Sequence, residues 1–208
     1  QAFTGIDCDI ELPPRLEYIG RVAFAHSPHC RGKLRLPETL KHIDEYAFWN
    51  ATGFRGTFSL PSNLEYLGQC AFLNCGTDLR GDIVIPTQLK SLPRSTLCAN
   101  VVDGSRLVLH NGITDIGVPE DLNSSVDSPV IPRNVSINNI ALPPFLEHIG
   151  QKAFSQCHIG GELCLPSNIK VIESSAFDGT DILGTLVLPK FLQKVMQNVF
   201  SFTDISSL

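Results

Sequence analysis

The sequence predicts a solenoid, a fold in which short repeats stack along one axis, and three features of its 208 residues indicate this. One apolar pattern returns in most of the chain every 23–25 residues. The chain contains 14 prolines and 16 glycines, which disfavour long helices. It is 43% hydrophobic and 18% charged, a composition typical of an ordered protein with a core. Each copy is too short to bury its own apolar face, so the copies must stack.

Each copy begins with a Leu-Pro-like step, and the same apolar positions follow it. The eight copies begin at Leu12, Leu36, Leu60, Ile85, Leu109, Leu142, Leu165 and Leu188. All copies have apolar residues four and seven positions later, and six copies have phenylalanine twelve positions later. Leu97 takes that place in the fourth copy, and Asp121 interrupts the column in the fifth. A period of this length lies in the range of leucine-rich repeats.

The pattern within one copy predicts its local structure. The "LxLP" segment alternates apolar and outward positions as a short strand does, and its proline ends the strand. The "LxxIG" segment predicts a second short extended stretch, followed by a turn at glycine. In the following "AF" corner, alanine leaves space and phenylalanine fills the interior. Copies in series predict parallel ladders with rungs about 4.8 Å apart.

The middle of the chain departs from the pattern. The fifth copy keeps Leu109, Ile113 and Ile116 but lacks the proline and the AF corner, and residues 123–140 are rich in Ser, Asn and Pro. This segment indicates a decayed repeat, a functional loop or a linker. Because the register resumes at Leu142, we expect one solenoid over residues 1–208, irregular at about 117–141. The partial copies at both ends predict a piece of a longer protein or short irregular caps.

The motif "LPxxLxxIGxxAFxxC", present at residues 60–75 and 142–157, resembles the BspA-like leucine-rich repeats of bacterial surface proteins. The resemblance covers about seven of the eight copies. It implies an exported or surface-anchored protein, and a role as an adhesin for host matrix proteins or other cells. It carries no catalytic residues.

Other classes of function lack support in the sequence. The net charge of −5 is unlike that of nucleic-acid-binding proteins, which favour a basic stripe. No apolar run approaches the ~20 residues of a membrane-spanning helix. The motifs GxSxG, HExxH, GxGxxG and the P-loop are absent, so we expect no enzyme activity and no cofactor.

Two outward columns of the predicted ladder are candidate binding surfaces. The column at the second x of "LxxIG" contains Tyr18, His42, Tyr66 and, further along, His148, and exposed Tyr is a frequent interface anchor. Packing of these rings on their neighbours is an equally good explanation. The column inside "LxL" becomes apolar at Val84, Val108 and Val187, which predicts either a contact strip or simple β-propensity. A third column alternates in sign, from Glu17 and Lys41 to Glu147 and Lys170, and predicts exposed ion pairs between rungs.

The cysteines and histidines support no metal site. His26, His29 and Cys30 lie close in sequence, but no fourth zinc ligand is near and a solvated connection is the simpler interpretation. Cys75 and Cys157 share a column with Ser, Ala and Thr, which predicts a small structural residue rather than a disulfide. Cys164 is expected to point outward.

We therefore predict a non-enzymatic, extracellular or cell-surface binding module with a protein ligand, no nucleic acid and no membrane-spanning segment. The alternatives are a structural spacer in a larger surface protein and a carbohydrate-binding module.

Overall fold

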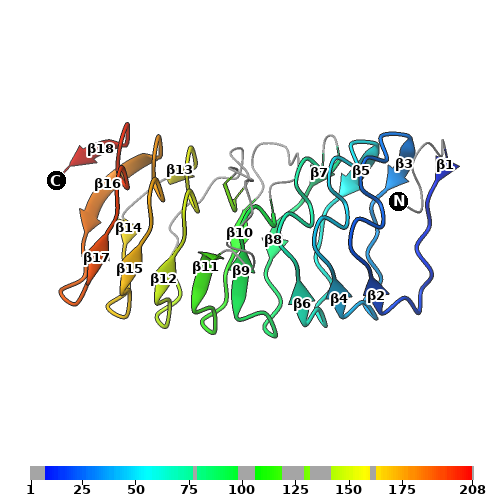
Figure 1. Ribbon diagram of the computed structural model, residues 1–208, viewed down its shortest axis with the longest axis horizontal. Helices are drawn as coiled ribbons and strands as arrows, with labels where there is room; N and C mark the ends of the chain where they lie inside the picture. The colour runs from blue at the N-terminus through cyan, green and yellow to red at the C-terminus, as the bar shows by residue number, and fades with distance from the viewer. Residues whose placement is uncertain are drawn as a thin grey trace.

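The computed structural model describes residues 8–76, 79–97, 106–118, 129–131, 142–159 and 163–207, and these form an elongated ladder of short strands (Figure 1). Every strand pairing among them is parallel. No helix occurs in this described part of the chain. The prediction of a solenoid with short parallel strands is confirmed.

The strands lie in three rows along the long axis of the molecule (Figure 1). The lower row contains β2 (Tyr18–Ile19), β4 (His42–Ile43), β6 (Tyr66–Leu67), β9 (Ser91–Pro93), β11 (Asp115–Val118), β12 (His148–Ile149), β15 (Val171–Ile172) and β17 (Lys194–Val195). The upper row contains β1 (Cys8–Asp9), β3 (Cys30–Lys33), β5 (Phe54–Thr57), β7 (Leu79–Arg80), β13 (His158–Ile159), β16 (Asp181–Val187) and β18 (Asp204–Ser207). The middle row contains β8 (Ile83–Val84), β10 (Leu107–Val108) and β14 (Leu163–Cys164), joined by the end of β16.

The lower row follows the predicted "LxxIG" segments, whereas the "LxLP" segments are strands in only part of the chain. In the second and third copies the strand comes earlier, as β3 and β5, and ends before the "LxL" letters. Backbone bonds from Leu34 N to Arg55 O (3.2 Å) and from Phe58 N to Arg80 O (2.7 Å) continue the pairing beyond these strands. Hydrogen bonds therefore still join neighbouring rungs at these "LxL" segments, but they are too few for the segments to form strands.

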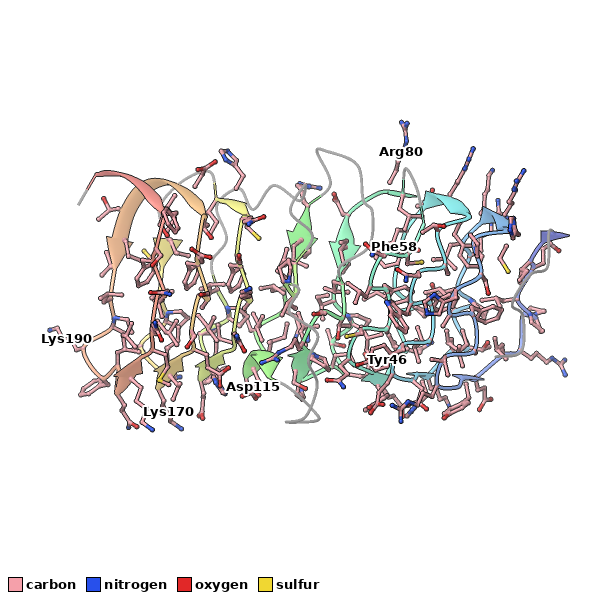
Figure 2. All side chains as sticks on the ribbon, turned by 45° about the horizontal axis from the view of Figure 1, so that its top comes forward. Tyr46, Phe58, Arg80, Asp115, Lys170 and Lys190 are labelled. Atoms are coloured by element: carbon pink, nitrogen blue, oxygen red, sulfur yellow. The ribbon has the colours of Figure 1, made fainter. Side chains whose placement is uncertain are left out.

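The AF corners form the centre of the core. The rings of Phe24, Phe48 and Phe72 stack with centroids 5.1 and 5.2 Å apart. The backbone joins the same corners, since Phe48 N donates to Ala71 O (2.8 Å) and Phe24 N donates to Ala47 O (2.7 Å). Each buried ring removes apolar surface from water, which contributes on the order of 1.5–3 kcal/mol per side chain. One column thus supplies both the apolar core and the contact between rungs; Figure 2 shows the labelled Phe58 in the same interior, between the rows.

Tight turns flank each corner. Non-glycine residues with positive φ lie two positions before the phenylalanine column, at Val22, Tyr46, Cys70, Ser95, Lys152, Ser175 and Asn198. The position two residues after the column repeats the feature, and Gly179 takes it in one copy. A left-handed backbone costs free energy for most residues, so the stacked neighbours must hold these turns in place.

The irregular fifth copy completes its corner with residues from further along the chain. Strand β11 pairs with β9 on one side and with β12 on the other. Val130 and Ile131 are fully buried, and Ile131 N donates to Ala153 O (3.4 Å), the type of bond that the corner phenylalanines make. Ile131 therefore makes the hydrogen bond between rungs that a corner phenylalanine makes in the regular copies. Of residues 117–141, only 117–118 and 129–131 are among the described residues, so the single domain over residues 1–208 remains a prediction.

Candidate binding surfaces

The first candidate surface is a stack of three side chains at the N-terminal end of the lower row. Tyr18, His42 and Tyr66 lie in register on β2, β4 and β6. The rings of Tyr18 and His42 stack with centroids 4.7 Å apart, and those of His42 and Tyr66 with centroids 4.2 Å apart. We call these three residues the aromatic stack. Because the rung spacing of a parallel ladder matches ring-stacking distance, one ring per rung produces the stack directly.

An acidic side chain fixes the end of the aromatic stack. The Tyr18 hydroxyl donates a hydrogen bond to Asp44 Oδ2 (2.8 Å), and His42 Nε2 lies 3.9 Å from Asp44 Oδ1. The hydrogen bond to Asp44 raises the pKa of Tyr18, with smaller contributions from desolvation and from the carboxylate charge. Tyr18 remains 54% exposed, while His42 and Tyr66 are half-buried. The His42 ring is covered on both faces, so a partner meets its edge rather than its face.

His148, the fourth predicted residue, lies apart from the aromatic stack. Ser91 on β9 and Asp115 on β11 occupy the intervening positions of the lower row. His148 Nε2 lies 3.2 Å from Glu173 Oε1 on the next rung. This contact is the main reason that the pKa of His148 is raised and that of Glu173 lowered, against opposing desolvation of each group. The ladder therefore does not bring His148 to the other three residues.

The predicted apolar strip points outward but is divided. Val84, Val108 and Val187 are 53%, 42% and 48% exposed. Val84 and Val108 are register partners on β8 and β10, whereas Val187 pairs with the exposed Cys164 on β14. Val84 also borders a shallow groove with Glu38, Ser59, Asn63 and Thr87. Outward orientation is thus as predicted, and a binding role for the strip remains a prediction.

The residues considered for zinc point in different directions. His26 is exposed and packs against the Trp49 ring with centroids 4.4 Å apart, His29 is exposed, and Cys30 is fully buried. Among the described residues, no group of three or more His, Cys, Asp or Glu side chains is arranged to hold a metal ion.

The column of small residues that contains Cys75 and Cys157 is buried. Cys75 and Cys157 are 0% and 2% exposed, and Ala51 and Thr180 at equivalent positions are fully buried. Burial raises the pKa of the Cys75 thiol, which keeps it protonated. Thr180 donates to Phe154 O (2.7 Å), so the column also bonds adjacent rungs.

The alternating-charge column has one ion pair in the C-terminal part of the lower row. Lys170 Nζ lies 2.5 Å from Glu147 Oε2 on the preceding rung. Both side chains are about half exposed. An exposed pair of this kind contributes about 0–1 kcal/mol, so the column affects register and solubility more than stability.

The upper row carries a surface that, apart from Arg35 in the "LxL" column, the predicted columns do not include. Arg31, Lys33, Arg35, Arg55 and Arg80 are all exposed, and they lie on or next to β3, β5 and β7. Figure 2 shows the labelled Arg80 side chain projecting away from the ladder. A sequence signal exists, because the pair Arg-Gly recurs at 31–32, 55–56 and 80–81. The signal is hidden by the overall net charge of −5.

Comparison with protein families gives one match across nearly the whole chain. Residues 1–103 and 105–208 match the family model described as "BspA type Leucine rich repeat region (6 copies)". Six copies are slightly fewer than the eight counted from the sequence pattern. No curated protein matches the chain. In the part of the chain that the structure describes, no helix is both long and apolar enough to cross a bilayer.

Proposed function

Since the chain belongs to the BspA-type leucine-rich repeat family, we propose that it is a binding module at the bacterial cell surface, with a protein ligand that contacts the aromatic stack. Host matrix proteins and the surfaces of neighbouring cells are the proposed partners. The observation that carries the proposal is a preformed row of rings whose outermost member, Tyr18, is 54% exposed.

Preorganisation is the reason that this row suits binding. Rings already stacked on one another and fixed by Asp44 lose little conformational freedom when a partner arrives. Tyr combines a large apolar surface with a polar end, which is why it is frequent in the energetic centres of interfaces. An extended ladder repeats this geometry over several rungs, as binding surfaces of solenoid proteins do.

The stacking also weighs against the carbohydrate-binding alternative. A sugar that stacks on an aromatic residue needs an open ring face, and the His42 ring has neighbours on both faces. The His42 ring offers only its edge, which suits hydrogen bonds and lateral contacts with a protein.

The test is direct binding of the purified chain to a panel of purified host matrix proteins by biolayer interferometry. The variant Tyr18→Ala/His42→Ala/Tyr66→Ala should bind its partner at least about tenfold more weakly, because it removes the centre of the contact. The control variant Phe145→Ala/Phe191→Ala removes two rings that are 60% and 77% exposed elsewhere on the ladder, and it should bind like the natural chain.

Thermal unfolding of both variants separates binding from folding. A triple variant that keeps its melting temperature and loses its partner supports the proposal. Binding retained by the triple variant contradicts this site, and no binding to any matrix protein favours the structural spacer.

A further inference from the structure

The exposed cations of the upper row form a second, separate surface. We call Arg31, Lys33, Arg35, Arg55 and Arg80 the cationic face. They come from three successive rungs, and β3, β5 and β7 are adjacent strands of one parallel sheet. Lys33 and Arg55 are direct register partners, and Arg80 pairs in register with Thr57 on β5. Parallel rungs lie about 4.8 Å apart, so Lys33 and Arg55 are close neighbours. Arg31 and Arg80 are each displaced along their strands by two residues from the position of Arg55, so the cations run diagonally across the three rungs.

The described acidic side chains leave most of this charge uncompensated. Within the described residues, Lys33, Arg35, Arg55 and Arg80 form no ion pair. Asp82, two residues after Arg80, is already engaged by Arg106, whose Nη2 lies 2.5 Å from Asp82 Oδ2. Arg106 also donates from its backbone N–H to Asp82 Oδ1 (3.2 Å). Glu11 lines a groove with Lys33 and Arg35, and Asp9 on β1 is the register partner of Arg31.

The backbone under the cationic face is shaped to hold these side chains close together. Gly32, Gly56 and Gly81 follow Arg31, Arg55 and Arg80, and all three glycines have positive φ. A Cβ atom on Gly56 would lie 3.2 Å from Cγ of Lys33, so the glycine leaves space for the lysine stem to cross the next rung. The recurring Arg-Gly pair therefore places one arginine per rung and clears the path beside it.

Like charges in register destabilise a sheet, so the aligned pair of Lys33 and Arg55 is unfavourable without a partner. The alternating column of the lower row shows that this ladder can place opposite charges on successive rungs, as at Glu147 and Lys170. Solubility does not require a line of cations in a chain whose net charge is −5. Four of the five cations are arginines, whose planar guanidinium groups bind sulfate, phosphate and carboxylate oxygens through paired hydrogen bonds.

We propose that the cationic face binds a linear polyanion, and that the polymer is a sulfated polysaccharide of the glycosaminoglycan class. A diagonal row of cations across three rungs matches a chain that carries anionic groups at intervals along its length. The groove beside Gly32, Lys33 and Arg35, with a volume of about 620 Å³, lies at the N-terminal end of this row and gives the polymer a path along the surface.

The surroundings of the face favour this polymer over other polyanions. Single-stranded nucleic acids are held by aromatic rings that stack between cations, and no aromatic residue is exposed on β3, β5 or β7. Anionic membranes are held by exposed apolar side chains next to the cations, and the exposed residues of these three strands are Arg, Lys and Thr. These strands offer hydrogen-bond donors and positive charge, and a sulfated sugar chain needs both.

The experiment measures heparin binding to the full chain by isothermal titration calorimetry over a series of salt concentrations. In Arg31→Gln/Arg55→Gln/Arg80→Gln we expect binding to weaken by about tenfold or more, with a shallower dependence of log Kd on log salt, because fewer counterions are released. The control Lys170→Gln/Lys190→Gln/Lys194→Gln removes the same charge from exposed positions of the C-terminal rungs and should stay within about twofold of the natural chain. The variant Arg31→Lys/Arg55→Lys/Arg80→Lys keeps the charge and should bind with intermediate strength.

Several outcomes overturn the proposal. These are no heparin binding at physiological salt, equal weakening in the two charge-removing variants, and full binding of desulfated heparin. Tighter binding of an oligothymidylate or of vesicles containing phosphatidylserine assigns the face to a different polyanion. Thermal unfolding checks the fold, and the Arg→Gln variant should melt at the same or a higher temperature because repulsion is removed. The Tyr18→Ala/His42→Ala/Tyr66→Ala variant should bind heparin normally, which distinguishes this face from the proposed protein-binding site.

Discussion

The N-terminal rungs (residues 8–97) and the C-terminal rungs (residues 142–207) have the same interior and different surfaces. In the N-terminal rungs the Phe24, Phe48 and Phe72 rings stack 5.1 and 5.2 Å apart. In the C-terminal rungs the corresponding distances are 5.1 and 5.4 Å, in a column formed by Phe154, Phe177 and Phe200.

The surfaces of the two groups of rungs diverge at equivalent positions. The N-terminal rungs carry the aromatic stack and the cationic face. The C-terminal rungs contain no Lys or Arg at residues 153–169 or 171–189, and their upper row instead places His158 Nδ1 3.5 Å from Asp181 Oδ2. Inward columns must match the rung above and the rung below, whereas outward columns meet solvent. Function is therefore expected where equivalent outward positions differ.

The largest expected effect tests whether the two interiors are equivalent. Phe48→Ala and Phe177→Ala each remove the middle ring of a three-ring column, and both rings are fully buried. Each substitution should lower the free energy of unfolding by about 3–5 kcal/mol, measured by urea denaturation, because a cavity replaces a ring between two others. If one variant loses less than about 1 kcal/mol, the two cores are not packed alike.

A smaller effect on stability is expected when a glycine in the interior of the ladder and a glycine at its end are each replaced by alanine. A Cβ atom on Gly150 would lie 2.1 Å from Gly117 O, whereas one on Gly20 would meet only Cε1 of Tyr18, at 3.4 Å. Gly150→Ala should destabilise the chain by about 1–3 kcal/mol, because the two rungs must separate. Gly20→Ala should change stability by about 0.5 kcal/mol or less. Equal melting temperatures for the two variants contradict the close contact between β11 and β12.

The smallest expected effect concerns two contacts at equivalent positions, whose contributions to stability should depend differently on pH. Tyr18 contacts Asp44, and His148 contacts Glu173, from the same column to the next rung. Because the pKa of His148 is raised in the folded state, protonated His148 stabilises the fold fully below pH 6.5. This stabilisation is lost as the pH rises through the raised pKa. Because the pKa of Glu173 is lowered in the folded state, ionised Glu173 stabilises the fold fully above pH 4.5. This stabilisation is lost as the pH falls through the lowered pKa. The pair should therefore stabilise the fold most between about pH 4.5 and 6.5.

Melting temperatures at pH 5.5 and pH 8.5 test this pair. Glu173→Gln should lower the melting temperature at pH 5.5 more than at pH 8.5, by the equivalent of about 1 kcal/mol or less for a partly exposed pair. Tyr18→Phe removes the hydroxyl bond to Asp44, whose donor does not titrate in this range, so its effect should be the same at both values. A pH-independent effect of Glu173→Gln rules out an ion pair with His148.

Sequence periodicity was sufficient to predict the inward columns and therefore the fold. Leu64, Ile149 and Phe154 lie in the core as their positions in the repeat require, because stacking buries these positions and therefore requires apolar residues there. The corner at Val130 and Ile131 could not be predicted, since it replaces an interrupted column with residues outside the regular spacing. The separation of His148 from the aromatic stack also depends on which residues stand at the same position of the intervening rungs.

The sequence by itself determined the repeat, its period and the division into inward and outward positions, because a stacked rung must bury the same columns in every copy. The tertiary structure decided which outward residues meet. It stacked His42 between two tyrosines, paired Asp82 with Arg106 rather than with Arg80, and aligned Lys33 with Arg55. Contacts of this kind join residues more than 20 positions apart and depend on the register between rungs and on side-chain geometry, to about an ångström, which the spacing of letters in a sequence does not specify.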